Sequence, residues 1–134
     1  MSRPARPAAS VPAADERTAA PWSFSLRPDP TLLFRFSALT YNAHRIHYDR
    51  DYARDVEGYP DLVVHGPLLA LALLELPRRF APERTVTSFA FRSKAPLFAP
   101  DAFVVSGTPD GDQALLTAGR PGAAPGISAT VTLG

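Results

Sequence analysis

The spacing of hydrophobic residues changes between residues 22 and 39. The run Trp22–Leu26 alternates apolar with polar residues, which predicts a strand buried on one face. Pro28 and Pro30 interrupt this pattern. Apolar residues then recur at helical spacing, at Leu32, Leu33, Phe36 and Leu39. This spacing predicts a helix over residues 32–39, with Thr31 as its N-cap.

A second helix is predicted to begin at Gly66 and Pro67, because proline is favoured in the first turn of a helix. The nine residues that follow are L-L-A-L-A-L-L-E-L, in which only Glu75 is polar. We expect Pro77 to end this helix. A helix that is apolar on nearly every side belongs in the centre of a fold. A further short helical turn is expected over residues 49–54.

The C-terminal part of the chain contains four β-like runs: 85–94, 102–107, 113–118 and 127–133. In the last run Ala129, Val131 and Leu133 alternate with hydroxyl side chains, which predicts one buried and one wet face. The sequence P-D-G-D at residues 109–112 predicts a hairpin turn. We therefore predict an α+β fold, in which an antiparallel sheet wraps around one central apolar helix. This topology resembles the hot-dog fold.

The length of 134 residues suits one domain, which we place at residues 22–134. Residues 1–21 are rich in proline, alanine and charge and lack hydrophobic periodicity, so we expect a disordered tail. An organelle-targeting peptide is a weaker interpretation of this tail, because Asp15 and Glu16 lie within it.

Charge and composition exclude several classes of partner. With 14 basic and 13 acidic residues, the chain has no basic field for a nucleic-acid backbone. The central apolar run, residues 63–74, is too short to span a bilayer. Cysteine is absent, so imidazole, carboxylate, hydroxyl and amide groups must carry any chemistry. We expect a soluble cytoplasmic protein without nucleic-acid or membrane partners.

All three histidines of the chain, His44, His47 and His65, lie within one stretch of 22 residues. Imidazole is the side chain best suited to moving protons near neutral pH. The segments around the histidines read T-Y-N-A-H-R-I-H-Y-D at residues 40–49 and V-V-H-G-P-L at residues 63–68. These segments are therefore the predicted centre of chemistry.

The run F-S-A-L-T-Y-N-A-H-R-I-H-Y-D-R-D-Y-A, residues 36–53, and the run E-G-Y-P-D-L-V-V-H-G-P-L, residues 57–68, resemble the MaoC-like dehydratase/hydratase family. Within it they are most similar to the mesaconyl- or itaconyl-CoA hydratases and the mitochondrial type of 3-hydroxyacyl-thioester dehydratase. The resemblance implies reversible addition of water to an enoyl thioester of coenzyme A or acyl carrier protein. We expect a short or medium acyl-CoA as substrate, and no metal or other cofactor.

The resemblance also implies roles for individual residues. The family uses an Asp and a His five residues apart, then a His-Gly pair at the start of the hot-dog helix. These positions fall on Asn42, His47, His65 and Gly66. Because an amide has no useful proton affinity, we assign the acid–base role to His47 and the orientation of water to the Asn42 carbonyl oxygen. His44 is a second acid–base candidate.

Gly66 suits the reaction for a reason independent of the family. Hydration of an enoyl thioester develops an enolate oxygen, which preorganised N–H donors stabilise. The first N–H groups of a helix have no partner within it, and a residue without Cβ lets a carbonyl approach the backbone. We therefore predict that the Gly66 N–H forms the oxyanion hole.

Four further side chains are predicted to contact the substrate: Tyr41, His44, Arg45 and His65. Arg45 suits a carboxylate or a coenzyme phosphate, but it could equally pair with Asp49. His65 could instead brace the start of the helix. A zinc site formed by the three histidines is a less favoured alternative, since a helix N-terminus can stabilise an enolate without metal.

Two other functions stay open. A thioesterase of the same fold would need a carboxylate to activate water, and Asp49 and Glu57 are the nearby candidates. The chain could also be a non-catalytic subunit of a heteromeric hydratase. For the hydratase as for these alternatives, the length allows one hot-dog unit, so we expect a homodimer or larger assembly, or pairing with a related hot-dog subunit.

Overall fold

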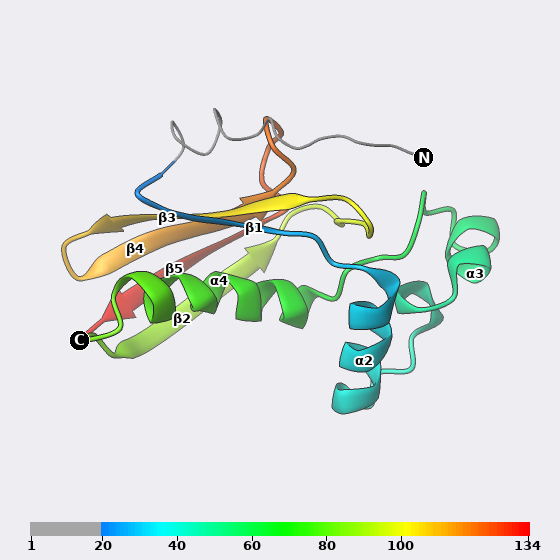
Figure 1. Cartoon of the computed structure of the whole chain (residues 1–134), viewed down its shortest axis with the longest axis horizontal. Helices are drawn as coiled ribbons and strands as arrows, with labels where there is room; N and C mark the ends of the chain where they lie inside the picture. The colour runs from blue at the N-terminus through cyan, green and yellow to red at the C-terminus, as the bar shows by residue number, and fades with distance from the viewer. Residues whose placement is uncertain (1–19) are drawn as a thin grey trace.

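The computed structural model describes residues 20–134, and its strands form one five-stranded antiparallel sheet in the order β1-β3-β4-β5-β2 (Figure 1). The predicted tail lies outside the described residues as far as residue 19. The strands are β1 (Trp22–Leu26), β2 (Val86–Ser93), β3 (Phe103–Asp110), β4 (Gln113–Gly119) and β5 (Ile127–Leu133). The helices are α2 (Pro30–Thr40), the 3-10 turn η1 (Arg45–His47), α3 (Arg50–Asp55) and α4 (Gly66–Phe80).

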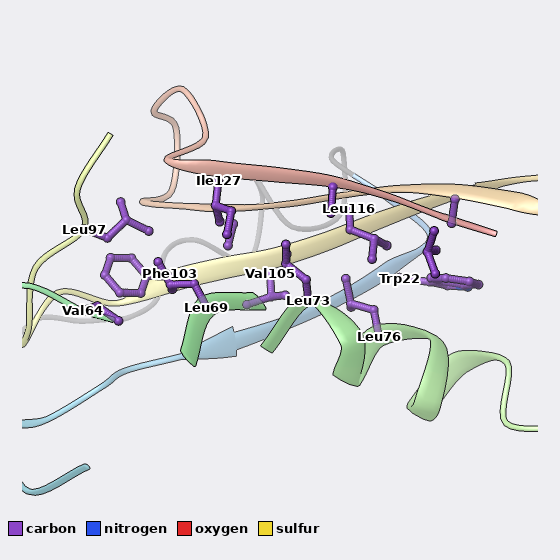
Figure 2. Close-up of a cluster of buried hydrophobic side chains, with 14 of the residues drawn as sticks. Trp22, Val64, Leu69, Leu73, Leu76, Leu97, Phe103, Val105, Leu116 and Ile127 are labelled. Atoms are coloured by element: carbon purple, nitrogen blue, oxygen red, sulfur yellow. The ribbon is translucent and has the colours of Figure 1, made fainter. Parts of the chain in front are cut away.

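Helix α4 lies along one face of the sheet, while α2 and α3 gather at one end of it (Figure 1). Leu73 and Leu76 of α4 are completely buried against the sheet. The strands contribute equally buried side chains, among them Phe103, Val105 and Leu116 (Figure 2). This interface is the hydrophobic core, and burial of its apolar surface is the main source of stability.

The predicted strands are confirmed, including the alternating burial of β5 and the turn between β3 and β4. Asp110 pairs with Gln113 across that turn, and Gly111 adopts the left-handed conformation that the turn requires, with φ 63°. The strands do not pair simply in chain order, because β2 pairs with β5 at the sheet edge. The segment that follows β2 pairs with residues 62–64, through a β-bridge between Phe98 and Val63.

Both predicted helix ends need correction. The N-cap of α2 is Asp29, whose side chain accepts from the Leu32 N–H at 2.8 Å, so Thr31 lies inside the helix. Helix α4 continues past Pro77 to Phe80. Glu75 forms ion pairs with Arg78 and Arg79 across the proline, which supports the last turn. A missing N–H close to a helix end is therefore tolerated.

One face of α4 and the edge strand β2 stay uncovered. Leu71 is 56% exposed, and on β2 Val86 and Phe91 are 38% and 48% exposed. The predicted central helix is therefore packed against the sheet, and in a single copy of residues 20–134 it keeps one exposed face. None of the helices in residues 20–134 is long and apolar enough to cross a membrane.

Candidate active site

Three segments that are separate in sequence meet at one end of the fold: the C-terminus of α2, the turn η1 and the N-terminus of α4. Helix α2 ends at Tyr41, which has the left-handed φ of 54°. The Asn42 N–H donates to the Ser37 carbonyl at 2.9 Å, and the Tyr41 N–H donates to the Ala38 carbonyl. This helix-ending geometry turns the chain back so that η1 passes beside the start of α4.

The His47 ring is held by a hydrogen bond to a backbone carbonyl. Its Nδ1 lies 2.7 Å from the Val63 carbonyl oxygen, and the residue is only 7% exposed. Since a carbonyl can only accept, Nδ1 carries the hydrogen and Nε2 is the nitrogen that gains and loses a proton. Within the described part of the chain, Nε2 has no hydrogen-bond partner and is not a fully enclosed atom.

Burial lowers the pKa of His47 below its ordinary value, and the nearby His44 lowers it further, although the hydrogen bond to the Val63 carbonyl acts in the opposite direction. At neutral pH the His47 ring is therefore neutral and its Nε2 can accept a proton. These are the properties that a general base requires.

The His65 ring stacks directly on the His47 ring, with centroids 3.8 Å apart and planes 16° apart. His65 is 1% exposed, and its Nε2 lies 2.8 Å from the Ser37 hydroxyl oxygen. Burial, and then the charge of His47, lower the pKa of His65 to about 4. His65 is thus neutral at neutral pH, and a direct contact with substrate would require its exposure.

Gly66 follows His65 and begins α4. The first backbone bond of the helix joins the Leu69 N–H to the His65 carbonyl at 3.1 Å, so the Gly66 N–H precedes the helical ladder. Among the described residues it has no backbone partner. A Cβ at Gly66 would meet only the Ser93 hydroxyl, at 3.7 Å. The packing of this chain therefore does not require glycine at this position.

Asn42 and His44 shape the loop ahead of His47. The Asn42 side-chain oxygen accepts from the His44 N–H at 3.0 Å, which forms a tight local turn. The exposed His44 ring lies 6.2 Å from the His47 ring, centroid to centroid. Asn42 is thus occupied in part by the loop, while the second lone pair of its oxygen and its amide nitrogen are available to a ligand.

Arg45 is engaged with its own neighbours. Its guanidinium donates to Asp49 at 2.9 Å and lies 4.2 Å from the Tyr52 ring centroid. The Tyr52 hydroxyl in turn donates to Glu57 at 3.0 Å. The ion pair with Asp49 that the sequence suggested is therefore present. Tyr41 is 96% exposed and is not packed against the other residues of the described range.

A shared metal site is not formed by the three histidines. Among residues 20–134, no group of three or more His, Cys, Asp or Glu side chains is placed to hold a metal ion. One ring nitrogen of His47 and one of His65 already bind protein atoms.

The sequence interpretation missed Ser37 and Val63. Ser37 lies four positions after Leu33 on the buried face of α2, and a lone serine on an apolar face was the available signal. Val63 contributes only its backbone carbonyl, which leaves no signature in the side chains. Ser37, His47 and His65 are the buried polar or charged residues of the described part of the chain.

Comparison with known proteins identifies the family of the chain. A sequence model of the family described as "Hydroxyacyl-thioester dehydratase type 2" (Htd2) matches residues 1–99. The chain is 58% identical over 107 residues to "Mesaconyl-C(4)-CoA hydratase" of Chloroflexus aurantiacus, covering 80% of this chain and 38% of that protein. It is 43% identical over 79 residues to the mitochondrial "Hydroxyacyl-thioester dehydratase type 2" of Schizosaccharomyces pombe, covering 58% and 26%. The chain thus spans well under half of the length of either relative.

Solved structures confirm the predicted hot-dog fold. The "(R)-hydratase from A. caviae involved in PHA biosynthesis" matches with a TM-score of 0.69 and 23% identity, over 83% of this chain and 90% of that one. The "ChsH1-ChsH2 complex from Mycobacterium tuberculosis" matches with a TM-score of 0.66 and 23% identity, over 83% and 91%. The second of these structures is a complex of two different proteins.

Proposed function

Since the chain belongs to the type 2 hydroxyacyl-thioester dehydratase family, we propose that it hydrates 2-enoyl thioesters and dehydrates 3-hydroxyacyl thioesters, with His47 as the acid–base residue. The observation that carries this proposal is the position of the His47 ring. It is fixed through Nδ1 and stacked on the residue that immediately precedes Gly66. A proton acceptor and a helix N-terminus thus lie side by side.

In the hydration direction, Nε2 of neutral His47 takes a proton from water while the water oxygen bonds to C3 of the enoyl group. The C2–C3 π electrons move toward the thioester carbonyl and give an enolate, whose oxygen accepts from the Gly66 N–H. The proton then passes from Nε2 of His47 to C2, which restores the carbonyl and the neutral ring. Dehydration is the reverse of these steps.

We propose roles for the other predicted site residues around this centre. We assign Asn42 to the orientation of the water through its side-chain oxygen, and His44 to the mouth of the site, where it is the second acid–base candidate. Tyr41 and Arg45 are assigned to contacts with the acyl group or coenzyme. Arg45 would have to exchange Asp49 for a substrate anion, which its exposed position allows.

We propose a short or medium acyl-CoA as the substrate, in keeping with the acyl-CoA in the name of the Chloroflexus relative. Acyl carrier protein is the alternative carrier. The predicted cytoplasmic location stays a prediction, because one relative is bacterial and the other is described as mitochondrial.

The geometry gives less support to a thioesterase. Asp49 caps α3 and pairs with Arg45, which lowers the pKa of its carboxyl below the ordinary value. Such a carboxylate is a poor base for the activation of water. Glu57 accepts from Tyr52 and is exposed.

An assay with crotonyl-, mesaconyl-, itaconyl- and longer enoyl-CoAs tests the proposal. We expect loss of the enoyl-thioester absorbance without release of free thiol. His47→Ala should lower kcat by at least about 10²-fold, and by more than His44→Ala, which compares the two acid–base candidates directly. Thiol release would indicate a thioesterase, and full activity of His47→Ala would reject the acid–base assignment.

We further propose that a second hot-dog subunit, identical or related, covers β2 and the exposed face of α4. A hollow of about 520 Å³ lies between these two elements, lined by Leu74, Pro77, Arg78, Pro82, Arg84, Val86 and Phe89. The exposed apolar side chains Leu71 and Phe91 belong to the same two elements. An unpaired edge strand beside an apolar surface is a ready pairing surface.

Light scattering after size exclusion tests this assembly. The wild type is expected to be a dimer or larger, and Phe91→Glu should shift it toward the monomer, while Leu115→Glu, an exposed leucine on a central strand, should not. A strictly monomeric wild-type chain that is fully active would contradict the proposal.

A further inference from the structure

We propose that Ser37 and His65 are a positioning pair, which holds the His47 ring from one side so that Nε2 keeps a single orientation as it gains and loses its proton. This inference rests on the proposed function, because it gives the pair a task only if His47 exchanges protons. Neither residue touches the reacting atoms in this assignment.

The stacking geometry is the first support. With centroids 3.8 Å apart and planes nearly parallel, the His65 ring covers one whole face of the His47 ring. The hydrogen bond from Nδ1 to the Val63 carbonyl fixes only one point of the His47 ring and allows rotation about that bond. The flat surface of His65 removes this remaining freedom, because rotation of His47 would drive its atoms into the stacked ring.

Ser37 holds His65 in turn. Its hydroxyl lies 2.8 Å from Nε2 of His65, and Phe36, the preceding residue of α2, packs edge-on against the same ring with centroids 4.8 Å apart. Helix α2 therefore fixes the plane of His65 through two consecutive residues. The chain of contacts runs from α2 through His65 to His47.

The other nitrogen of His65 shows that packing alone does not account for this residue. Nδ1 is buried and has no hydrogen-bond partner within the described residues. A buried polar atom without a partner destabilises a fold, and an apolar side chain would avoid that loss. The stack with His47 needs a flat, neutral ring that is held in one orientation. The imidazole of His65 meets this need, because one of its nitrogens is anchored.

The electrostatic surroundings of the pair are simple. In the described part of the chain, the titratable groups that act on the two rings are His44 from the loop before η1 and the two histidines themselves. Among the described residues, helix α2 contacts His65 through Ser37 and Phe36, neither of which carries a charge. Because His65 stays neutral, it excludes water from His47 without adding charge. If the contact between Ser37 and His65 is lost, water reaches the His47 ring, and the pKa of His47 should rise toward its ordinary value.

Ser37→Ala tests the proposal in the full chain by two measurements. The first is the titration of the His47 ring nitrogens by ¹⁵N NMR, which requires no activity. The midpoint is expected to move to higher pH than in the wild type. The second is the pH profile of hydration, in which the acidic limb of kcat/KM should move in the same direction. We expect kcat to fall roughly 10-fold or more while KM changes little, because misplacement of a catalytic group acts on the chemical step.

Ser23→Ala is the matched control, since the Ser23 hydroxyl is also buried but has no hydrogen-bond partner among the described residues. It should leave both the titration and the activity unchanged. Thermal unfolding of each variant separates loss of positioning from loss of fold. Ser37→Thr, which keeps the hydroxyl, should restore the wild-type midpoint where Ser37→Ala does not.

Two results would overturn the positioning pair. One is a His47 titration and a kcat in Ser37→Ala that match the wild type. The other is an equal shift in Ser23→Ala, which would make the effect a general one of buried serines. An active His47→Ala enzyme would instead reject the proposed function, so the two failures are distinguishable.

Discussion

The interface between α4 and the sheet and the end of the fold around η1 are both buried, but their chemistry differs. The interface consists of aliphatic and aromatic side chains, such as Leu73, Phe103 and Val105, that are completely enclosed (Figure 2). The end around η1 contains the buried polar side chains of the described part, namely Ser37, His47 and His65. It also contains a buried nitrogen, Nδ1 of His65, that has no hydrogen-bond partner among residues 20–134.

This difference separates what the fold needs from what the chemistry needs. An apolar interface gains stability from every methylene that it buries. Buried imidazoles reduce stability, and they persist where a function uses them. The polar end lies at the start of the same helix whose middle forms the core, so one rigid element supports both regions.

Two glycines, one in each region, provide the sharpest test of this comparison. Gly66→Ala places a Cβ where the protein leaves ordinary space, so the free energy of unfolding should change by less than about 1 kcal/mol. The new methyl group should block the approach of the thioester to the Gly66 N–H. We expect kcat/KM to fall roughly 10²–10³-fold, which is about 3–4 kcal/mol of barrier.

Gly107→Ala is the counterpart in the core. Its Cβ would lie 3.0 Å from atoms of Leu116 and Trp22, so overpacking should lower the free energy of unfolding by about 1–3 kcal/mol. The enoyl-CoA assay and urea unfolding measure the two effects separately. A Gly66→Ala protein that is fully active, or one that is as unstable as Gly107→Ala, would contradict the division between the two regions.

The dependence of stability on pH is the second test. The pKa of His65 is lowered from 6.5 to about 4 in the folded chain, so the unfolded chain binds more protons between these values. Stability should therefore be complete above about pH 6.5 and decline as the pH falls toward 4, by on the order of 2–3 kcal/mol. The lowered pKa of His47 acts with the same sign.

Urea unfolding at intervals from pH 7 to pH 5 measures this decline, since ordinary carboxylates stay largely ionised in that range. His65→Leu should flatten the curve by removing one of the two buried imidazoles. Glu75→Gln is the control, because the pKa of Glu75 is lowered to about 2 and its contribution is lost only below about pH 4.5. A slope that is unchanged in His65→Leu would show that the His65 ring is not buried as a neutral group.

The two regions also differ in how far the sequence predicts them. Alternation identified β1 and β5, and helical spacing identified α2, because burial on one face leaves a regular pattern of side chains. The motif predicted His47 and Gly66 as parts of one site, and in the structure the His47 ring stacks on His65, the residue that precedes Gly66. The sequence did not reveal the Val63 carbonyl or the stacking of His65, because backbone acceptors and ring planes depend on tertiary packing. The pairing of β2 with β5 was missed for the same reason.

Tyr41 gives the smallest expected effect and joins stability to function at a single residue. It ends α2 in the left-handed conformation, which is unfavourable for a residue with a Cβ, and its side chain is 96% exposed. Tyr41→Gly should therefore raise the free energy of unfolding by roughly 0.5–1 kcal/mol, after allowance for the greater freedom of glycine in the unfolded chain. Leu39→Gly, at an exposed position two residues earlier and inside α2, should lower the free energy of unfolding by about 1 kcal/mol.

If Tyr41→Gly is less stable than the wild type, the tyrosine side chain makes a contact that its exposed surface does not suggest. If it is more stable and KM for enoyl-CoA rises, the tyrosine is retained for the predicted substrate contact, at the expense of the helix end.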